Sequence, residues 1–185
     1  MKIVATKLPG VVVIEPAVFP DARGSFRTTF RTDAFESAGV EHRFVQDNVS
    51  ESCRGVLRGL HFQHPQGQAK LVYVLHGEVF DVAVDVRVDS PTFGRAAWTT
   101  LSGENRLQVF IPPGFAHGFV VTSDHALVAY KCSTLYAPAF EQVIHWNDPS
   151  LEIPWPVPEP LLAPRDADAP LLAHLPRELL PRMIP

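Results

Sequence analysis

The feature that most constrains the fold is a strict alternation of side chains between Glu78 and Arg87. One set of alternate positions is entirely apolar: Phe80, Val82, Val84 and Val86. The other set holds Val79, Asp81, Ala83, Asp85 and Arg87. Successive side chains of a β-strand point to opposite faces, so this pattern predicts a strand in a sheet whose two faces meet different environments.

Shorter runs of the same kind recur along the chain, separated by Gly, Pro, Asn or Ser. They cover residues 11–19, 44–50, 55–63, 70–76, 96–101, 107–111, 117–121 and 126–133. A single helix is expected near residues 33–39, where Asp33 and Glu36 resemble a capping box and Gly39 can end the helix. Many strands with few helices predict a mainly β sandwich or barrel rather than a parallel α/β sheet.

The length of 185 residues predicts one domain over residues 1–185. A net charge of −4 gives no support for nucleic-acid binding, and no apolar run is long enough to cross a membrane. The opening residues, MKIVATKLPG, lack the apolar core of a signal peptide, so we expect a cytoplasmic protein.

Proline becomes frequent from residue 149 to residue 185, and few strands can continue there. This Pro-rich tail still contains Trp155 and several leucines. We therefore expect it to pack on the main domain rather than to hang free in solvent.

Cationic and titratable side chains gather in residues 55–70, where Arg58, His61, His64 and Lys70 follow one another closely. By strand parity, His61 shares a face with Leu57, Gly59 and Gln63. A histidine there can be a general base, although a structural histidine is the commoner case. Lys70 follows a glycine-containing loop and enters an apolar strand, where its charge would be useful for binding an anion.

A second informative stretch is IPPGFAHGF, residues 111–119, which forces a turn and then presents His117. Proline and glycine before a histidine are typical of the second metal motif of cupin barrels. The matching first motif is missing, because His61 and His64 in HFQH are three residues apart and would point to opposite faces. Cys53 and Cys132 complete no metal set either. The sequence therefore favours a cupin barrel without a metal site.

Further candidates are scattered along the chain. Tyr130 and Tyr136 lie in VAYKCSTLYAP, and a tyrosine there is more often core or rim than catalyst. Arg23 in DARGSF carries a planar guanidinium suited to phosphate. Asp166 in the tail would normally be a turn residue, and its distance from His61 along the chain gives no reason to pair the two.

Taken together, these segments resemble the dTDP-4-dehydrorhamnose 3,5-epimerase family. The resemblance covers nearly the whole chain, in order, and its most specific parts are GVLRGLHFQ and PPGFAHGF. The other matching segments are DARGSF, FVQDNVSES, QAKLVYVLHGEVFDVAVDVR, SPTFG, YKCS with YAP, WNDPSLEIPWP and APRD.

The resemblance implies a metal-free cupin jelly-roll that needs no cofactor and acts on a dTDP-linked 4-keto-6-deoxy sugar. It assigns the catalytic base to His61, its partner carboxylate to Asp166, the acid to Tyr130 and the lysine near the keto oxygen to Lys70. It also implies a substrate-binding set: Arg23, Phe26, Thr28, Gln46, Asn48, Arg58, His117, Tyr136 and Arg165.

The family is usually homodimeric, with part of each pocket supplied by the neighbouring subunit, so residues 1–30 are expected at the dimer interface. Three positions depart from the family pattern. Thr28 replaces a glutamate, Leu135 replaces an aromatic residue, and Arg165 replaces a lysine.

Three functions remain open from the sequence besides the double epimerase. The first is a single-site epimerase serving an unusual deoxysugar, since the same residues would serve both reactions. The second is a non-catalytic sugar-nucleotide-binding cupin, and the third is a metal-dependent cupin oxygenase. A complete acid–base set argues against the binding protein, because binding alone does not need one.

Overall fold

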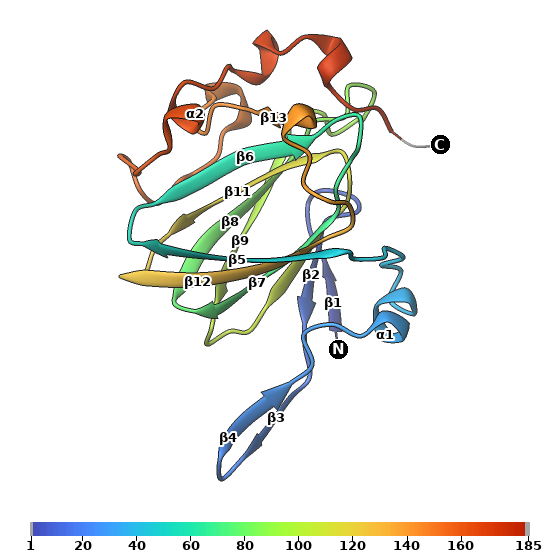
Figure 1. Ribbon diagram of the computed structural model, residues 1–185, viewed down its shortest axis with the longest axis vertical. Helices are drawn as coiled ribbons and strands as arrows, with labels where there is room; N and C mark the ends of the chain where they lie inside the picture. Colours follow the sequence, from blue (N-terminus) through green and yellow to red (C-terminus); the bar gives the residue numbers. More distant parts are fainter. Residues whose placement is uncertain (1, 184–185) are drawn as a thin grey trace.

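The computed structural model describes residues 2–183, and two antiparallel sheets dominate it (Figure 1). The larger sheet has the strand order β1-β2-β10-β7-β12-β5. Its strands are β1 (Lys2–Ala5), β2 (Val12–Glu15), β10 (Gln108–Ile111), β7 (Lys70–His76), β12 (His125–Cys132) and β5 (Gln46–Cys53). The smaller sheet has the order β13-β6-β11-β8-β9. Its strands are β13 (Glu141–Val143), β6 (Leu57–Gln63), β11 (Phe115–Val121), β8 (Glu78–Asp85) and β9 (Ala96–Ser102).

A separate hairpin, β3 (Val18–Asp21) with β4 (Gly24–Arg27), projects away from the two sheets (Figure 1). The helices are all short. They are α1 (Thr32–Glu36), α2 (Pro164–Ala167) and the 3₁₀ turns η1 (Pro138–Phe140), η2 (Pro149–Leu151), η3 (Leu172–His174) and η4 (Arg177–Leu179). No helix in the described part of the chain has the length and apolar character that crossing a membrane requires.

The predicted mainly β jelly-roll with a packed tail is confirmed, and nearly every predicted run coincides with a strand. The run 11–19 is an exception, because it breaks at Pro16 and Ala17 into β2 and β3, which belong to different sheets. The capping box was also wrong. The helix begins one residue before Asp33, whose carboxylate binds the Arg31 guanidinium at 2.7 Å.

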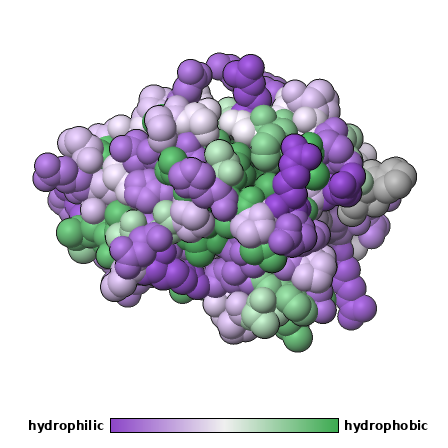
Figure 2. Space-filling view, turned by 90° about the horizontal axis from the view of Figure 1, so that it is seen from above, coloured by the Kyte–Doolittle hydropathy of each residue, from purple (hydrophilic) through white to green (hydrophobic). Residues whose placement is uncertain are grey.

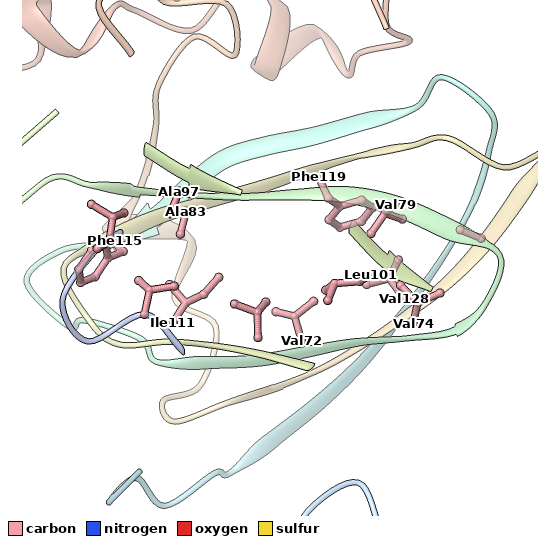
Figure 3. Close-up of a cluster of buried hydrophobic side chains, with 14 of the residues drawn as sticks. Val72, Val74, Val79, Ala83, Ala97, Leu101, Ile111, Phe115, Phe119 and Val128 are labelled. Carbon is pink, nitrogen blue, oxygen red and sulfur yellow. The ribbon is translucent and has the colours of Figure 1, made fainter. Parts of the chain in front are cut away.

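The main core lies between the two sheets, where side chains from both inner faces meet (Figure 3). The larger sheet contributes Val72, Val74 and Val128, and the smaller sheet contributes Val79 and Phe119, all buried. This packing is what the alternating pattern requires, because every second residue of each strand turns inward.

The Pro-rich tail covers the outer face of the smaller sheet. Val82 and Val84 of β8 pack there in one cluster with Leu151, Leu172 and Leu180 of the tail. Both faces of β8 are therefore buried. As predicted, one set of alternate residues is apolar and the other includes carboxylates. Seen from above, hydrophilic residues cover much of the surface, and hydrophobic residues show between them and in a group at the lower edge (Figure 2).

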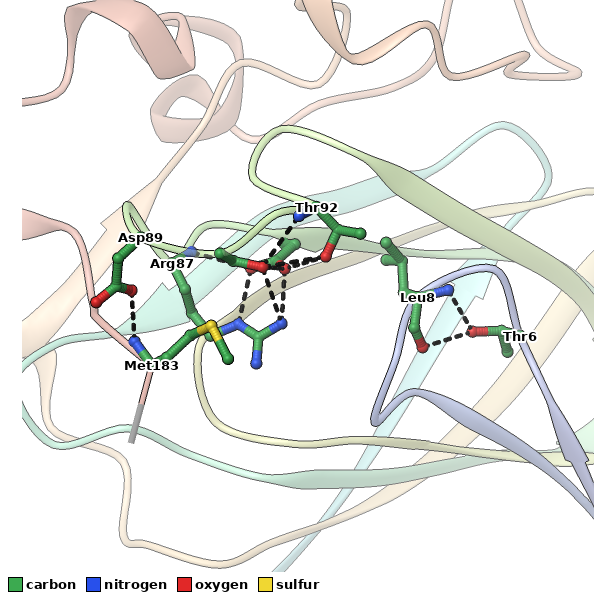
Figure 4. A network of polar contacts seen from close by, with 8 residues as sticks. Thr6, Leu8, Arg87, Asp89, Thr92 and Met183 are labelled. Atoms are coloured by element: carbon green, nitrogen blue, oxygen red, sulfur yellow. Dashed lines mark hydrogen bonds and ion pairs between the residues drawn. The ribbon is translucent and has the colours of Figure 1, made fainter. Parts of the chain in front are cut away.

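The inward carboxylate of Asp85 is neutralised where β8 ends. Asp85 is fully buried, and the Arg87 guanidinium lies 2.6 Å from its Oδ2. The hydroxyls of Ser90 and Thr92 each donate to the same oxygen at 2.6 Å, and the network of contacts around Arg87 and Thr92 is drawn in Figure 4. This network joins the end of β8 to the turn that leads into β9.

Candidate active site

A cavity of about 600 Å³ opens between the two sheets, lined by both of them and by α2 of the tail. It brings together ten of the thirteen predicted site residues: Gln46, Asn48, Arg58, His61, Lys70, His117, Tyr130, Tyr136, Arg165 and Asp166. The remaining three, Arg23, Phe26 and Thr28, do not line it.

The floor of the cavity holds a histidine–carboxylate pair. His61 Nε2 of β6 lies 2.8 Å from Asp166 Oδ1 of α2, and the Gly59 N–H donates to Asp166 Oδ2 at 3.3 Å. Burial disfavours the charged carboxylate, but the hydrogen bond and charge of His61 and the Gly59 N–H outweigh it, so the pKa of Asp166 is lowered. With Nε2 committed to Asp166, Nδ1 is the nitrogen left to accept a proton.

An irregularity in β6 places Arg58 in the same cavity as His61. The pairing of β6 with β11 runs His117 to His61 and then Phe119 to Arg58, so the register shifts between them. Simple alternation puts residues three apart on opposite faces, which is why strand parity did not group Arg58 with His61. The Arg58 Nε donates to Ser52 Oγ at 3.1 Å.

Tyr130 and Lys70 come from the larger sheet, facing the histidine on the smaller one. Tyr130 pairs with Val72 across the β12–β7 ladder, and Lys70 pairs with Cys132 in the same ladder. Burial raises the pKa of the Tyr130 phenol and lowers the pKa of the Lys70 ammonium. The phenol thus keeps its proton at neutral pH, and the lysine is held largely away from water.

His117 also lines the cavity and belongs to a second buried pair. Its Nε2 lies 2.8 Å from Asp81 Oδ2, with His117 6% and Asp81 2% exposed. The alternation in the sequence predicted that Asp81 and Asp85 share one face of their strand, but it predicted no role for Asp81 at the site. The structure turns that face into the barrel.

At the rim, Glu141 connects two predicted residues and had itself been missed. The Tyr136 hydroxyl donates to Glu141 Oε2 at 2.7 Å, and Arg165 Nη1 donates to the same oxygen. Arg165 Nη2 also lies 3.4 Å from His61 Nε2. Glu141 stands in no motif and on a three-residue strand, so no local sequence signal identified it.

Gln46 and Asn48 form the polar wall on β5. Gln46 Nε2 donates to Asn48 Oδ1 at 3.0 Å, and Gln46 Oε1 accepts the Tyr136 backbone N–H at 2.8 Å. Asn48 Nδ2 lies 3.5 Å from the Cys132 sulfur. These contacts fix both amides, and Asn48 is the partner of Tyr130 across the β5–β12 ladder.

Arg23, Phe26 and Thr28 lie on or just after the projecting hairpin. Phe26 is 67% exposed, and Arg23 pairs only with Asp21 of the same hairpin at 2.6 Å. Thr28 is exposed one residue after β4. The hairpin projects away from the two sheets that enclose the cavity (Figure 1).

The donor set of the cavity is nitrogen-rich and cationic. Within residues 2–183, no group of three or more His, Cys, Asp or Glu side chains is arranged to hold a metal ion. His64 does not line the cavity, and His61 and His117 each face a carboxylate instead. The arrangement suits proton transfer beside an anionic ligand.

A jelly-roll barrel with a carboxylate-supported histidine, a facing tyrosine and a partly buried lysine defines a cupin-type acid–base enzyme. The chain belongs to the dTDP-4-dehydrorhamnose 3,5-epimerase family, whose model matches residues 5–174. The resemblance drawn from the sequence is thereby confirmed.

Two curated relatives and one solved structure illustrate the similarity. The dTDP-4-dehydrorhamnose 3,5-epimerase of Neisseria gonorrhoeae is 54% identical over 90% of this chain, which spans 51% of that relative's length. The enzyme of the same name from Methanothermobacter thermautotrophicus is 52% identical, with 84% of each chain covered. A crystal structure from Legionella pneumophila, a dTDP-6-deoxy-D-glucose-3,5-epimerase in complex with dTDP-4-keto-L-rhamnose, has a TM-score of 0.97 at 50% identity. It covers 100% of this chain and 99% of that one.

Proposed function

We propose that this protein inverts carbons 3 and 5 of dTDP-4-keto-6-deoxy-D-glucose, giving dTDP-4-keto-L-rhamnose for dTDP-L-rhamnose synthesis. The observation that carries the proposal is the placement of the His61–Asp166 pair and Tyr130 on facing walls of one cavity, with Lys70 between the same two sheets. Inversion at a carbon beside a ketone needs a base on one face and an acid on the other.

In each inversion, His61 takes the proton from the carbon beside the ketone. The electron pair of the broken C–H bond moves to the keto oxygen, forming an enolate. The Lys70 ammonium stabilises that oxygen in a cavity from which the bound substrate displaces water. Tyr130 then donates its proton to the opposite face of the carbon, and the ketone re-forms. The His61 imidazolium gives its proton to solvent and the Tyr130 phenolate takes one from solvent, so both groups are reset before the next inversion.

Asp166 supports the base. Its carboxylate holds one His61 tautomer and stabilises the imidazolium that forms when the proton is taken. Positioned acid–base groups of this kind typically contribute roughly 10²–10⁴-fold each to a rate.

Binding of the nucleotide explains the cationic character of the cavity in a protein of net charge −4. We assign Arg58 and Arg165, which line the cavity, to the diphosphate, because an acidic protein needs local cations to bind so anionic a group. Tyr136, 49% exposed at the rim, offers a flat ring for the base. Further polar groups for the nucleotide come from Gln46, Asn48 and His117.

The protein acts as a homodimer in which the hairpin β3–β4 of one subunit completes the cavity of the other. In support, the hairpin displays Phe19 and Phe26 at 60% and 67% exposure and carries Arg23 away from its own cavity. Large exposed aromatic side chains on a projecting hairpin are typical of an intersubunit contact. The free thiols Cys53 and Cys132 fit a reducing compartment, so we place the enzyme in the cytoplasm.

The deciding experiment is incubation with dTDP-4-keto-6-deoxyglucose in heavy water, with a coupled reductase to trap the product. Deuterium at carbons 3 and 5 by NMR, together with a rhamnose product, is the expected result. Label at one carbon only would make the protein a single-site epimerase. Binding of dTDP without label at either carbon would refute the catalytic proposal.

A further inference from the structure

One hydroxyl in the cavity wall has no partner. Among the described residues, Ser50 Oγ is the buried side-chain nitrogen or oxygen that forms no hydrogen bond. Ser50 lines the cavity on β5. A buried hydroxyl without a partner costs free energy, so it indicates a group that is satisfied only in another state of the protein.

The neighbours of Ser50 on the same face of β5 are all engaged. Gln46 donates to Asn48, Asn48 contacts the Cys132 sulfur, and Ser52 Oγ accepts from Arg58 Nε. These residues alternate along one strand, so they form a polar row on one face of β5, of which Gln46, Asn48 and Ser50 line the cavity. Ser50 is the one member of this row left free.

The strand register places Ser50 between the reacting end of the cavity and its arginine. Asn48 pairs with Tyr130 and Ser50 with Val128 across the β5–β12 ladder. Ser52 is the next residue on this face of β5, and its hydroxyl accepts a hydrogen bond from Arg58 Nε. Arg58 is close enough to Tyr130 for its charge to favour the phenolate. A group beside Ser50 would thus lie between the proton donor and the guanidinium.

We propose that the Ser50 hydroxyl is a substrate-binding group that donates a hydrogen bond to the phosphate attached to the sugar. This inference rests on the proposed function. The phosphate is the group that joins the reacting ring to the part of the ligand held by Arg58, and its oxygens are strong acceptors. Rotation about the Cα–Cβ bond turns the free hydroxyl into the cavity without breaking any existing hydrogen bond.

The test is Ser50→Ala, with dissociation constants measured for dTDP and for thymidine, which lacks phosphate. We expect dTDP affinity to fall about tenfold, as for loss of a hydrogen bond to a charged group, with thymidine affinity unchanged. The melting temperature of the free protein should stay the same or rise, because the substitution removes an unsatisfied buried hydroxyl. A purely structural role predicts the opposite change in stability.

The matched control is Ser102→Ala. Ser102 is also buried, but its hydroxyl accepts the Asn105 N–H at 2.9 Å and does not line the cavity. This variant should lose stability and keep its dTDP affinity.

Unchanged dTDP affinity in Ser50→Ala would overturn the proposal. A loss seen with the sugar-bearing substrate but not with dTDP would also overturn it, because the hydroxyl would then contact the sugar ring. An epimerase assay of the wild-type protein tests the proposed function separately. The role of Ser50 and the proposed function can therefore fail independently.

Discussion

His61 Nε2 lies 2.8 Å from Asp166 Oδ1, although 105 residues separate the two in the chain. The contact joins β6, the second strand of the smaller sheet, to a four-residue helix in the Pro-rich tail. The tail is therefore part of the candidate site as well as a cover for the barrel. The contact also determines which histidine nitrogen remains for chemistry.

Asp166→Asn should lower the rate of deuterium exchange into substrate by roughly 10²–10⁴-fold, because the neutral amide no longer stabilises the imidazolium. Single-turnover exchange in heavy water measures this effect. Asp168→Asn, an exposed change just after α2, is the control and should behave as wild type. A rate within twofold of wild type in Asp166→Asn would remove the carboxylate from the mechanism.

His61→Asn should abolish exchange at both carbons while leaving the dTDP dissociation constant nearly unchanged, since the imidazole is assigned to the sugar end. Parallel exchange and calorimetric titration would separate the two effects. His64→Asn, three residues further along and outside the cavity, should keep full activity. Wild-type exchange rates in His61→Asn would exclude it as the base.

Lys70→Met should stabilise the protein near neutral pH while removing activity. Burial lowers the Lys70 pKa. At pH values below that lowered pKa, the folded protein carries a charged ammonium in a partly dry site, and this reduces its free energy of unfolding. As pH rises through the lowered pKa toward the ordinary value of about 10.4, the wild-type lysine loses its proton in the folded state first. The wild type then gains stability, and the advantage of Lys70→Met should shrink.

Urea unfolding of both proteins over a series of pH values would measure that difference. Lys2→Met, at a side chain 75% exposed, should show no such trend. A constant difference between Lys70→Met and wild type at all pH values would contradict the argument.

Arg87→Met should destabilise the fold by about 3–5 kcal/mol, because it leaves the fully buried Asp85 carboxylate without its charge partner. Denaturant unfolding measures the loss. The double variant Asp85→Asn with Arg87→Met should lose less than the sum of the two single changes. Strict additivity would mean that the pair is not coupled.

Mixing Arg23→Ala with His61→Asn tests the exchange of hairpins between subunits. Each variant alone should have little activity at low substrate. In a mixed dimer, one cavity combines the intact His61 of one chain with the intact Arg23 of the other. Random reassembly should therefore restore about a quarter of wild-type activity, since half of the dimers are mixed and each has one complete cavity. No restoration would place Arg23 at its own chain's cavity, and full activity of Arg23→Ala alone would place it outside the site.

The strands were predictable because their determinant is local. Alternation of side chains defined β8, and similar runs located β7 and β12, since successive residues of a strand point to opposite faces of its sheet. The segments GVLRGLHFQ and PPGFAHGF likewise carried the family resemblance, and with it His61 and His117, because they are contiguous.

Other features were decided only by the tertiary structure. Arg58 joined His61 through a register shift that alternation cannot foresee, and Glu141 reached Tyr136 and Arg165 from a strand with no motif. The sequence by itself determined which segments form strands and which residue types the site would use. The packing of the tail against β6 decided that Asp166 meets His61, because such a contact depends on the path of the whole chain and not on spacing along it.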